Sequence, residues 1–187
     1  MNVPIKEVIK SIPGFFGIRL EHTPRYDVVY EGDIEIRRYA PFIVAQITVG
    51  GPREKALDEA FKQLAAFIFG DNQSHQTLPM TNPVFFEETK SGWLMSFYLE
   101  DRKNIPVSFN KSITIHEYEE KFVAAYQFTG NMSDEKMNES KLELLAKMRN
   151  IPGYRAVSEV YWAQYDAPFT IPFMKKNEAL VHIVNPS

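Results

Sequence analysis

Cysteine is absent from this chain of 187 residues. Its absence excludes disulfide bonds, thiolate metal sites and a cysteine nucleophile. Long hydrophobic runs are missing too, because the longest unbroken apolar stretch, Leu64 to Phe69, is far shorter than the roughly 18 residues that span a bilayer. The N-terminal residues do not resemble a secretory signal, since Pro4, Lys6 and Glu7 interrupt their apolar character. We therefore predict a cytoplasmic protein without a membrane span.

A strongly basic surface is also missing. The chain carries 21 Lys and Arg against 24 Asp and Glu, a formal net charge of −3, whereas nucleic-acid-binding domains usually carry an excess of positive charge. Phosphate-binding loops and nucleophile-elbow motifs do not occur, and the four histidines are too far apart in sequence to form a metal-binding motif. We expect no nucleic-acid partner and no preorganised metal site.

The remaining composition is that of an ordinary globular protein. Hydrophobic residues make up 44% of the chain and charged residues 24%, which is enough apolar material for a substantial core. Aromatic residues reach 13%, with 14 Phe and 9 Tyr. This aromatic content stands out in an otherwise ordinary composition.

An internal repeat organises the chain. The segment Ile34–Tyr39 (IEIRRY) is echoed by Ile113–Tyr118 (ITIHEY), and both alternate apolar and polar residues as half-buried strands do. Glycine and proline positions, together with Ser133 as a helix N-cap, delimit the elements that follow. Each copy continues with a strand, a helix and two more strands, at 42–49, 52–69, 83–88 and 93–99 in the first copy, and at 122–129, 134–150, 157–165 and 179–184 in the second.

The repeat predicts an α+β fold. Because one such half cannot bury both faces of its sheet alone, we expect two pseudo-symmetric ββαββ halves, residues 33–99 and 112–184, to form a distorted antiparallel β-barrel with one helix packed on the sheet in each half. Residues 1–25 are expected to form an N-terminal arm, and residues 26–187 a single domain. A long loop, residues 166–178, precedes the last strand.

The first helix is unusually apolar around its circumference. Its apolar arc spans roughly 220°, more than packing on one sheet requires. Two interpretations remain open: the helix is covered by a loop, or it lines a groove for a flat hydrophobic ligand. The central stripe contains Leu57, Phe61, Leu64, Ala65 and Ile68.

The long loop before the last strand mixes apolar and basic residues. It holds Phe169, Phe173 and Met174 directly before Lys175 and Lys176. Long apolar loops are often functional, and this mixture would suit an amphiphile with an apolar body and anionic groups. A proline-braced surface loop is the alternative.

Three carboxylates are candidates for acid–base chemistry. Glu35, Glu159 and Glu178 lie in or beside predicted strands, where a buried Glu with a neighbouring Tyr could catalyse hydrolysis or isomerisation. Such an enzyme would need a carboxyl group with a raised pKa inside a cleft.

Several motifs together resemble the SOUL heme-binding proteins, whose fold is like that of gyrase-inhibitory and drug-sensing proteins. The most specific is Met80–Val84 (MTNPV), which matches the family's M-T-x-P-V motif. The resemblance covers about residues 26–184, and its other carriers are Tyr26–Val29 (YDVV), Gly32–Tyr39 (GDIEIRRY), Ala60–Phe61, Leu64, Ile68, Gly70, Asn72, Tyr161–Pro168 (YWAQYDAP) and Asn177–Glu178.

The resemblance implies a non-enzymatic carrier or buffer, most simply a monomer, for heme or iron-free porphyrin. The implied contacts are Phe61, Leu64, Ala65 and Ile68 on the first helix, Phe169, Phe173 and Met174 closing the pocket, and Lys175 and Lys176 pairing with the propionates. Arg38 stands where some members have a His proposed as an axial iron ligand, and Ala66 replaces a basic residue, so no metal ligand is assigned. An effector-binding module and, less favoured, a cleft hydrolase are the alternative functions.

Overall fold

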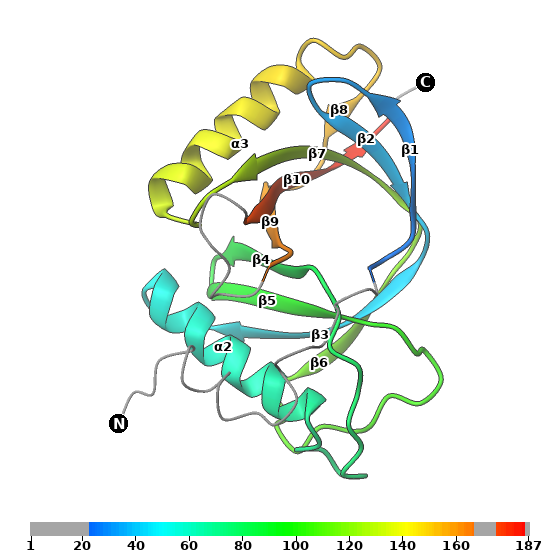
Figure 1. Cartoon of the computed structure of the whole chain (residues 1–187), viewed down its shortest axis with the longest axis vertical. Coiled ribbons are helices and arrows are strands. Elements are labelled where there is room, and N and C mark those ends of the chain that lie inside the picture. The colour runs from blue at the N-terminus through cyan, green and yellow to red at the C-terminus, as the bar shows by residue number, and fades with distance from the viewer. Residues whose placement is uncertain (1–22, 167–174, 186–187) are drawn as a thin grey trace. The chain divides into compact units, whose positions relative to one another are not determined.

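The computed structural model describes residues 23–166 and 175–185 of the chain (Figure 1). It divides into two compact units. Among the described residues, the first unit comprises Ile43–His116, and the second comprises Pro24–Phe42, Glu117–Asp166 and the C-terminal segment from Lys175. The predicted arm, residues 1–25, lies almost wholly outside the described residues. Each unit contains one helix packed on antiparallel strands.

The first unit consists of β3 (Phe42–Val49), α2 (Arg53–Ile68), β4 (Val84–Thr89), β5 (Gly92–Leu99) and the start of β6 (Thr114–Tyr118). The strand order is β4-β5-β3-β6, and β5 pairs antiparallel with both β4 and β3. The helix α2 packs against β5. Alternate residues of β3 and β5 meet one face of α2 in a hydrophobic core that includes Ile43, Ala45, Ile47, Met95, Phe97, Leu64 and Ile68.

A glycine fixes the turn between β4 and β5. Gly92 has a φ of +134°, and a Cβ atom built on it would lie 2.3 Å from the carbonyl oxygen of Val49. Any other residue would clash with the backbone of β3 and adopt a strained conformation. This close approach lets β5 pair along the whole length of β3.

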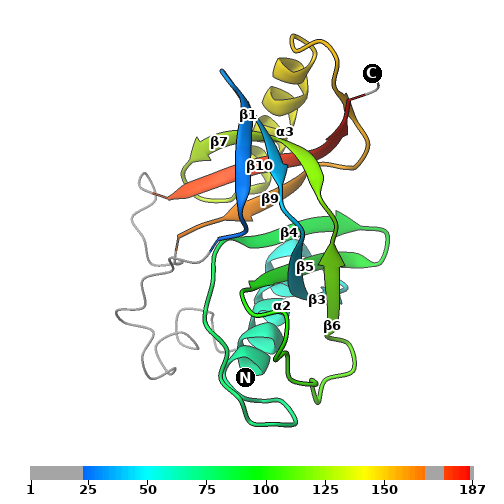
Figure 2. The ribbon, with the colours of Figure 1, turned by 90° about the vertical axis from the view of Figure 1, so that its right-hand side faces the viewer.

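The second unit combines antiparallel strands from the N-terminal and C-terminal parts of the chain. In order along the sheet they are β1 (Tyr26–Glu31), β2 (Glu35–Tyr39), β7 (Lys121–Thr129), β10 (Lys176–Val184) and β9 (Tyr161–Gln164), with β8 (Arg155–Ala156) also paired to β10. Figure 2 shows β1 and β2 running side by side. The helix α3 (Asp134–Met148) packs against β7 and β10.

Local sequence explains where α3 begins and how it is held. The Ser133 hydroxyl accepts a hydrogen bond from the backbone N–H of Lys136, and Asp134 and Glu135 place negative charge in the first turn. On the inner face of the helix, the Trp162 indole N–H of β9 donates to the Ser140 hydroxyl at 3.1 Å. The helix is therefore capped at one end and anchored to the sheet at its middle.

The α+β class and the repeated ββαββ pattern are confirmed. Three parts of the chain differ from expectation. The predicted strand 157–165 is replaced by β8 at Arg155–Ala156 and β9 at Tyr161–Gln164. β1 was not predicted as a strand, because all six of its residues are exposed and no alternation marks it. The last strand begins at Lys176, because Asn177 and Glu178 pair with Phe128 and Gln127 of β7, so the predicted loop ends before them.

Candidate functional site

The predicted groove residues of α2 belong to the first unit's core. Leu64, Ala65 and Ile68 are buried, and Phe61 is half-buried with its ring edge-on to Phe97 at a centroid distance of 5.4 Å. The structure brings these four side chains together on the face of α2 that meets the strands. Their role as ligand contacts stays a prediction.

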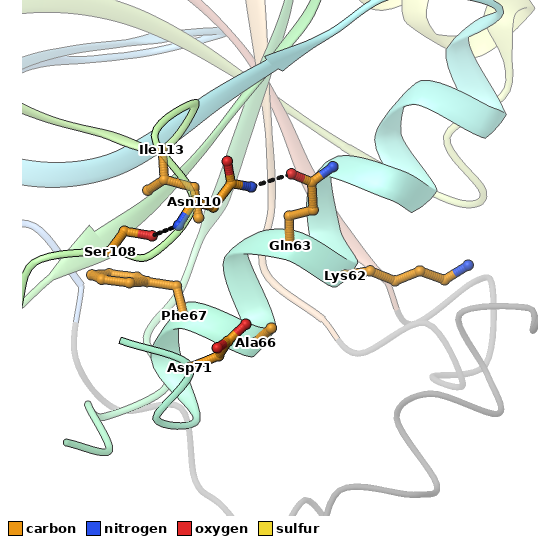
Figure 3. A pocket seen from close by; sticks show the side chains of 8 residues that line it. All are labelled: Lys62, Gln63, Ala66, Phe67, Asp71, Ser108, Asn110 and Ile113. Atoms are coloured by element: carbon orange, nitrogen blue, oxygen red, sulfur yellow. Dashed lines mark hydrogen bonds between the residues drawn. The ribbon is translucent and has the colours of Figure 1, made fainter. Parts of the chain in front are cut away.

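A small pocket lies beside α2 and opens to solvent (Figure 3). Its volume is about 180 Å³, below the roughly 300–1,000 Å³ of typical ligand sites. This α2 pocket is too small for a tetrapyrrole and has room for one side chain or a small molecule. Its lining residues are Lys62, Gln63, Ala66, Phe67 and Asp71 of α2 and the segment after it, and Ser108, Asn110 and Ile113 of the segment before β6.

The structure separates the two predicted propionate-binding lysines. Lys175 is buried, and its Nζ donates to the side-chain oxygen of Asn131 at 3.2 Å. Lys176 has a side chain 46% exposed, with its Nζ 4.7 Å from the centre of the Tyr165 ring. Of the two, only Lys176 has an exposed side chain, and its Nζ also lies 3.8 Å from the Glu178 carboxylate. Phe169, Phe173 and Met174 lie outside the described residues.

A fully buried ion pair lies within the second unit. Arg37 of β2 donates from Nη1 and Nη2 to the two carboxylate oxygens of Glu178 on β10, each at 2.8 Å. Both side chains are completely buried. Bidentate geometry of this kind is the strongest arrangement available to a guanidinium and a carboxylate. The pair joins two strands that lie on either side of β7.

Further polar groups complete the hydrogen bonding of this pair. The Tyr165 hydroxyl donates to Glu178 at 2.6 Å, and the Gln127 side-chain amide donates to the other carboxylate oxygen at 3.2 Å. Arg37 Nε donates to Glu35 at 2.6 Å. The exposed edge of the cluster is aromatic, because the Tyr26 ring covers the Arg37 guanidinium at 4.5 Å. Arg37 and Glu178 therefore each have a hydrogen-bond partner in addition to the other.

Ionisation in the cluster follows from burial and pairing. Burial alone would raise the pKa of Glu178, but the hydrogen bonds and positive charge of Arg37 outweigh it and hold that pKa below its usual value. Burial raises the pKa of Tyr165 well above the ordinary phenol range, and the charge of Glu178 adds to the effect. Glu178 is thus an ionised acceptor and Tyr165 a neutral donor at neutral pH.

This arrangement does not supply an acid catalyst. Glu178 has a lowered pKa where general-acid catalysis needs a raised one. Of the other two candidates, Glu35 is engaged by Arg37, and Glu159 is an exposed residue near Lys141 on α3. The three carboxylates are not gathered into one site. Glu159 makes none of the hydrogen bonds that join Glu35 and Glu178 through Arg37.

A second cluster in the same unit surrounds His182. The Lys121 ammonium lies 2.9 Å from His182 Nε2 and 3.4 Å from the centre of the Tyr118 ring. The His182 ring also meets Tyr161 edge-on at 5.1 Å. Burial, and then the charge of Lys121, lowers the pKa of His182 to about 4. The neutral imidazole therefore uses Nε2 to accept the lysine's hydrogen bond.

Groups that could ligate a metal are scattered. Within residues 23–166 and 175–185, no three His, Asp or Glu side chains gather closely enough to hold a metal ion. Arg38, at the position of the proposed axial ligand, is exposed and pairs with Asp27 at 2.9 Å. Nor does any helix in these ranges have the length and apolar character needed to cross a membrane.

Sequence reasoning singled out Glu178 but missed its partner Arg37. The alternation in residues 34–39 places Arg37 on the face opposite Ile34 and Ile36, which reads as the solvent side. In the structure Ile36 and Arg37, on opposite faces of β2, are both buried, so the prediction of a solvent-exposed Arg37 is wrong. The available signal was the pattern Glu35-x-Arg37-x-Tyr39, which sets three hydrogen-bonding side chains on one strand face.

Comparison with solved structures places the fold among known domains. The EcmrR C-terminal domain superposes with a TM-score of 0.62 at 11% identity, covering 86% of this chain and 98% of that one. An uncharacterized conserved protein from Listeria innocua gives 0.59 at 12%, covering 83% and 94%. A hydrolase from the same organism gives 0.56 at 12%, covering 81% and 92%. At such identities the likeness concerns the fold alone.

Comparison at the level of sequence is more specific. Curated proteins yield no match. The family model described as SOUL heme-binding protein matches residues 21–182, a range that contains the first repeat copy, all but the last two residues of the second, and both Arg37 and Glu178. Because the match spans most of the sequence, this chain belongs to the SOUL heme-binding protein family.

Proposed function

We propose that this protein is a non-enzymatic carrier or buffer that binds heme or a related tetrapyrrole. The observation that carries the proposal is the family match over residues 21–182. The aromatic and apolar composition supports it, because burial of a macrocycle's apolar surface would supply most of the affinity. Of the contacts expected from the sequence, Phe61 is only partly buried and Lys176 is exposed, and both stay in the proposal with residues 169, 173 and 174. Leu64, Ala65 and Ile68 are buried, and Lys175 is buried against Asn131, so these four are not proposed as contacts.

Two candidate iron ligands do not fit, and the proposal uses neither of them. His182 Nε2 is engaged by Lys121, and Arg38 stands at the position of the family's proposed His ligand. The α2 pocket is too small for the macrocycle. We therefore expect binding that depends on apolar contacts and on propionate charge, with little difference between hemin and iron-free protoporphyrin.

The proposal disfavours a hydrolase built on Glu178 and Tyr165 for a chemical reason. A hydrolase built on Glu178 and Tyr165 would need one of them to exchange a proton near neutral pH. Arg37 stabilises the ionised carboxylate, and burial stabilises the neutral phenol, so neither group is poised to do so. Similarity in fold to a hydrolase from Listeria innocua does not alter this electrostatic argument.

Parallel titrations with hemin and protoporphyrin test the proposal. Trp93 on β5 and Trp162 on β9 report on the two units separately, so single Trp→Phe variants tell which unit lies nearer the ligand. Saturable one-to-one binding of both ligands is the expected result. Binding of hemin alone would require a protein ligand to iron. If neither ligand binds at micromolar concentration, the tetrapyrrole proposal fails and other small amphiphiles become the candidates.

The loop lysine provides a sharper prediction. Lys176→Glu should weaken protoporphyrin binding by about two- to fivefold, because an exposed ion pair contributes little, and should leave binding of the dimethyl ester unchanged. Lys136→Glu on α3 is the matched control, since its side chain is also 46% exposed. Fluorescence titration measures both. Equal affinities for all three proteins would show that Lys176 is not a propionate anchor.

A further inference from the structure

Two large apolar side chains are displayed by a well-fixed loop of the first unit. Val107 is 63% exposed and Phe109 53% exposed, on the segment between β5 and β6. The loop is tied down: the backbone N–H of Gln73 donates to the Val107 carbonyl at 2.9 Å, and residues 72 and 108 form a β-bridge. Their exposure is therefore part of an ordered surface, and with Leu142 they are the three most exposed large apolar side chains of the described residues. We call Val107 and Phe109 the apolar knob.

The apolar knob adjoins the α2 pocket. Ser108 and Asn110, the residues on either side of Phe109, line that pocket, and Asn110 hydrogen-bonds to Ser108 and to Gln63 of α2 (Figure 3). Phe67 and Ile113 form its apolar part. A protruding aromatic side chain and a recess of about 180 Å³ thus lie next to each other on one surface. A two-fold dimer built on one surface requires such a pairing of a protruding group with a recess.

Charges around the two features are also complementary. Asp71, an exposed residue, lines the α2 pocket, while Lys111, also exposed, follows the apolar knob in sequence. The other charged lining residue, Lys62, is already paired with Asp58 at 2.6 Å. The α2 pocket therefore carries the acidic Asp71, and the basic Lys111 lies two residues after Phe109 of the apolar knob.

We propose that this surface binds a second copy of the same chain. Phe109 of each protomer enters the α2 pocket of its partner, and Lys111 of each pairs with Asp71 of the other. A two-fold axis makes both contacts twice, as in isologous dimers. A lipid surface fits less well, because residues 100–112 carry Glu100 and Asp101 against Arg102, Lys103 and Lys111 and so lack a strong basic excess. This inference is independent of tetrapyrrole binding, and it differs from the monomer expected from the sequence.

Molar mass measured by sedimentation or light scattering over a range of concentrations tests the proposal with the full chain. The wild type should form dimers at high micromolar concentration. Phe109→Ser should raise the dimer dissociation constant at least about tenfold, because it removes the central aromatic anchor. Leu142→Ser on α3 is the matched control, being 59% exposed in the other unit, and should dimerise like the wild type. Circular dichroism verifies folding of each variant.

Charge-reversal variants test the proposed ion pair between Asp71 of one protomer and Lys111 of the other. Asp71→Lys and Lys111→Asp should each weaken the dimer, and the variant carrying both changes should recover it. A wild type that stays monomeric overturns the proposal and leaves the pocket to a small ligand. A dimer that is insensitive to Phe109→Ser and to both charge reversals also overturns it, because the interface would then lie elsewhere. Recovery in the double variant supports it even if Phe109→Ser fails to fold.

Discussion

At the scale of single residues, the Arg37–Glu178 pair shows what sequence reasoning could and could not reach. Glu178 was recognisable as a carboxylate before the last strand, but its partner lies 141 positions earlier in the chain. Neither charge is stabilising by itself, since desolvation offsets much of the attraction in a buried pair. What matters is that neither can be removed alone. No sequence pattern predicts that Arg37 and Glu178 depend on each other, because they meet only when β2 and β10 lie on either side of β7.

Arg37→Met should therefore be severely destabilising. It leaves the buried Glu178 carboxylate without its guanidinium, at a cost of about 3–5 kcal/mol in the free energy of unfolding. Arg38→Met is the matched control, since the neighbouring side chain is exposed and pairs with exposed Asp27; its stability should stay close to that of the wild type. Urea denaturation measures both. Equal stability of the two variants would refute the importance assigned to the buried pair.

The His182–Lys121 contact predicts a pH dependence. The folded state lowers the pKa of His182 from 6.5 to about 4, so the unfolded chain binds the proton more readily between these values. Stability from this group is complete above the unfolded pKa and is lost as pH falls toward 4, by an amount on the order of 3 kcal/mol.

Comparing His182→Gln with the wild type isolates this contribution. The glutamine cannot titrate, and its side-chain oxygen can still accept from Lys121. From pH 7 to pH 5 the free energy of unfolding should fall more steeply in the wild type than in the variant. The lowered pKa of Glu178 affects stability only below its ordinary value of 4.5, outside this window. Parallel curves for the two proteins would disprove the assignment to His182.

At the scale of elements, periodicity located most strands and both helices to within a few residues. The predicted helix 52–69 corresponds to α2 at Arg53–Ile68, and the strand 42–49 coincides with β3. The strand β1 was missed because its residues carry no buried face to mark it. The wide apolar arc of α2 had two interpretations, and the structure shows much of it packed against strands of the first unit. Helix periodicity alone cannot tell a core from a groove.

Leucine-to-alanine changes on the two helices test that packing. Leu64→Ala on α2 should lower the free energy of unfolding by about 3 kcal/mol, because the side chain is completely buried in the core. Leu142→Ala on α3 should change it little, because that side chain is 59% exposed. Thermal or urea unfolding measures both. A small effect at Leu64 would mean that the site relaxes easily, as the wall of an open groove would.

At the scale of the whole molecule, the two sequence repeats do not coincide with the two compact units. The strand β2 belongs to the first copy, yet it pairs with β7 of the second. In the equivalent position, β6 of the second copy follows β3 of the first in the strand order. The first strand of each copy thus completes the other copy's sheet. Sequence comparison of the two copies reveals their likeness but not this exchange, because pairing partners are set by tertiary contacts.

This exchange predicts that the second copy cannot fold alone. A fragment of residues 112–187 lacks β1 and β2, so β7 would lose a paired neighbour and Glu178 its only guanidinium partner among the described residues. It should be largely unfolded by circular dichroism. A synthetic peptide of residues 24–42 should restore structure when added in excess, because it supplies both missing strands and Arg37.

The same peptide with Arg37→Met is the control for the ion pair, and a peptide with Arg38→Met is the control for sequence change as such. Restoration by the Arg38→Met peptide but not by the Arg37→Met peptide would show that the guanidinium joins the two segments. If the fragment alone gives a cooperative thermal transition, the second copy is self-sufficient, and strand exchange is a feature of topology without energetic weight. The dissociation constant of each peptide for the fragment measures how strongly the two segments associate. The difference between the constants of the wild-type and Arg37→Met peptides therefore gives the contribution of the Arg37–Glu178 pair to that association.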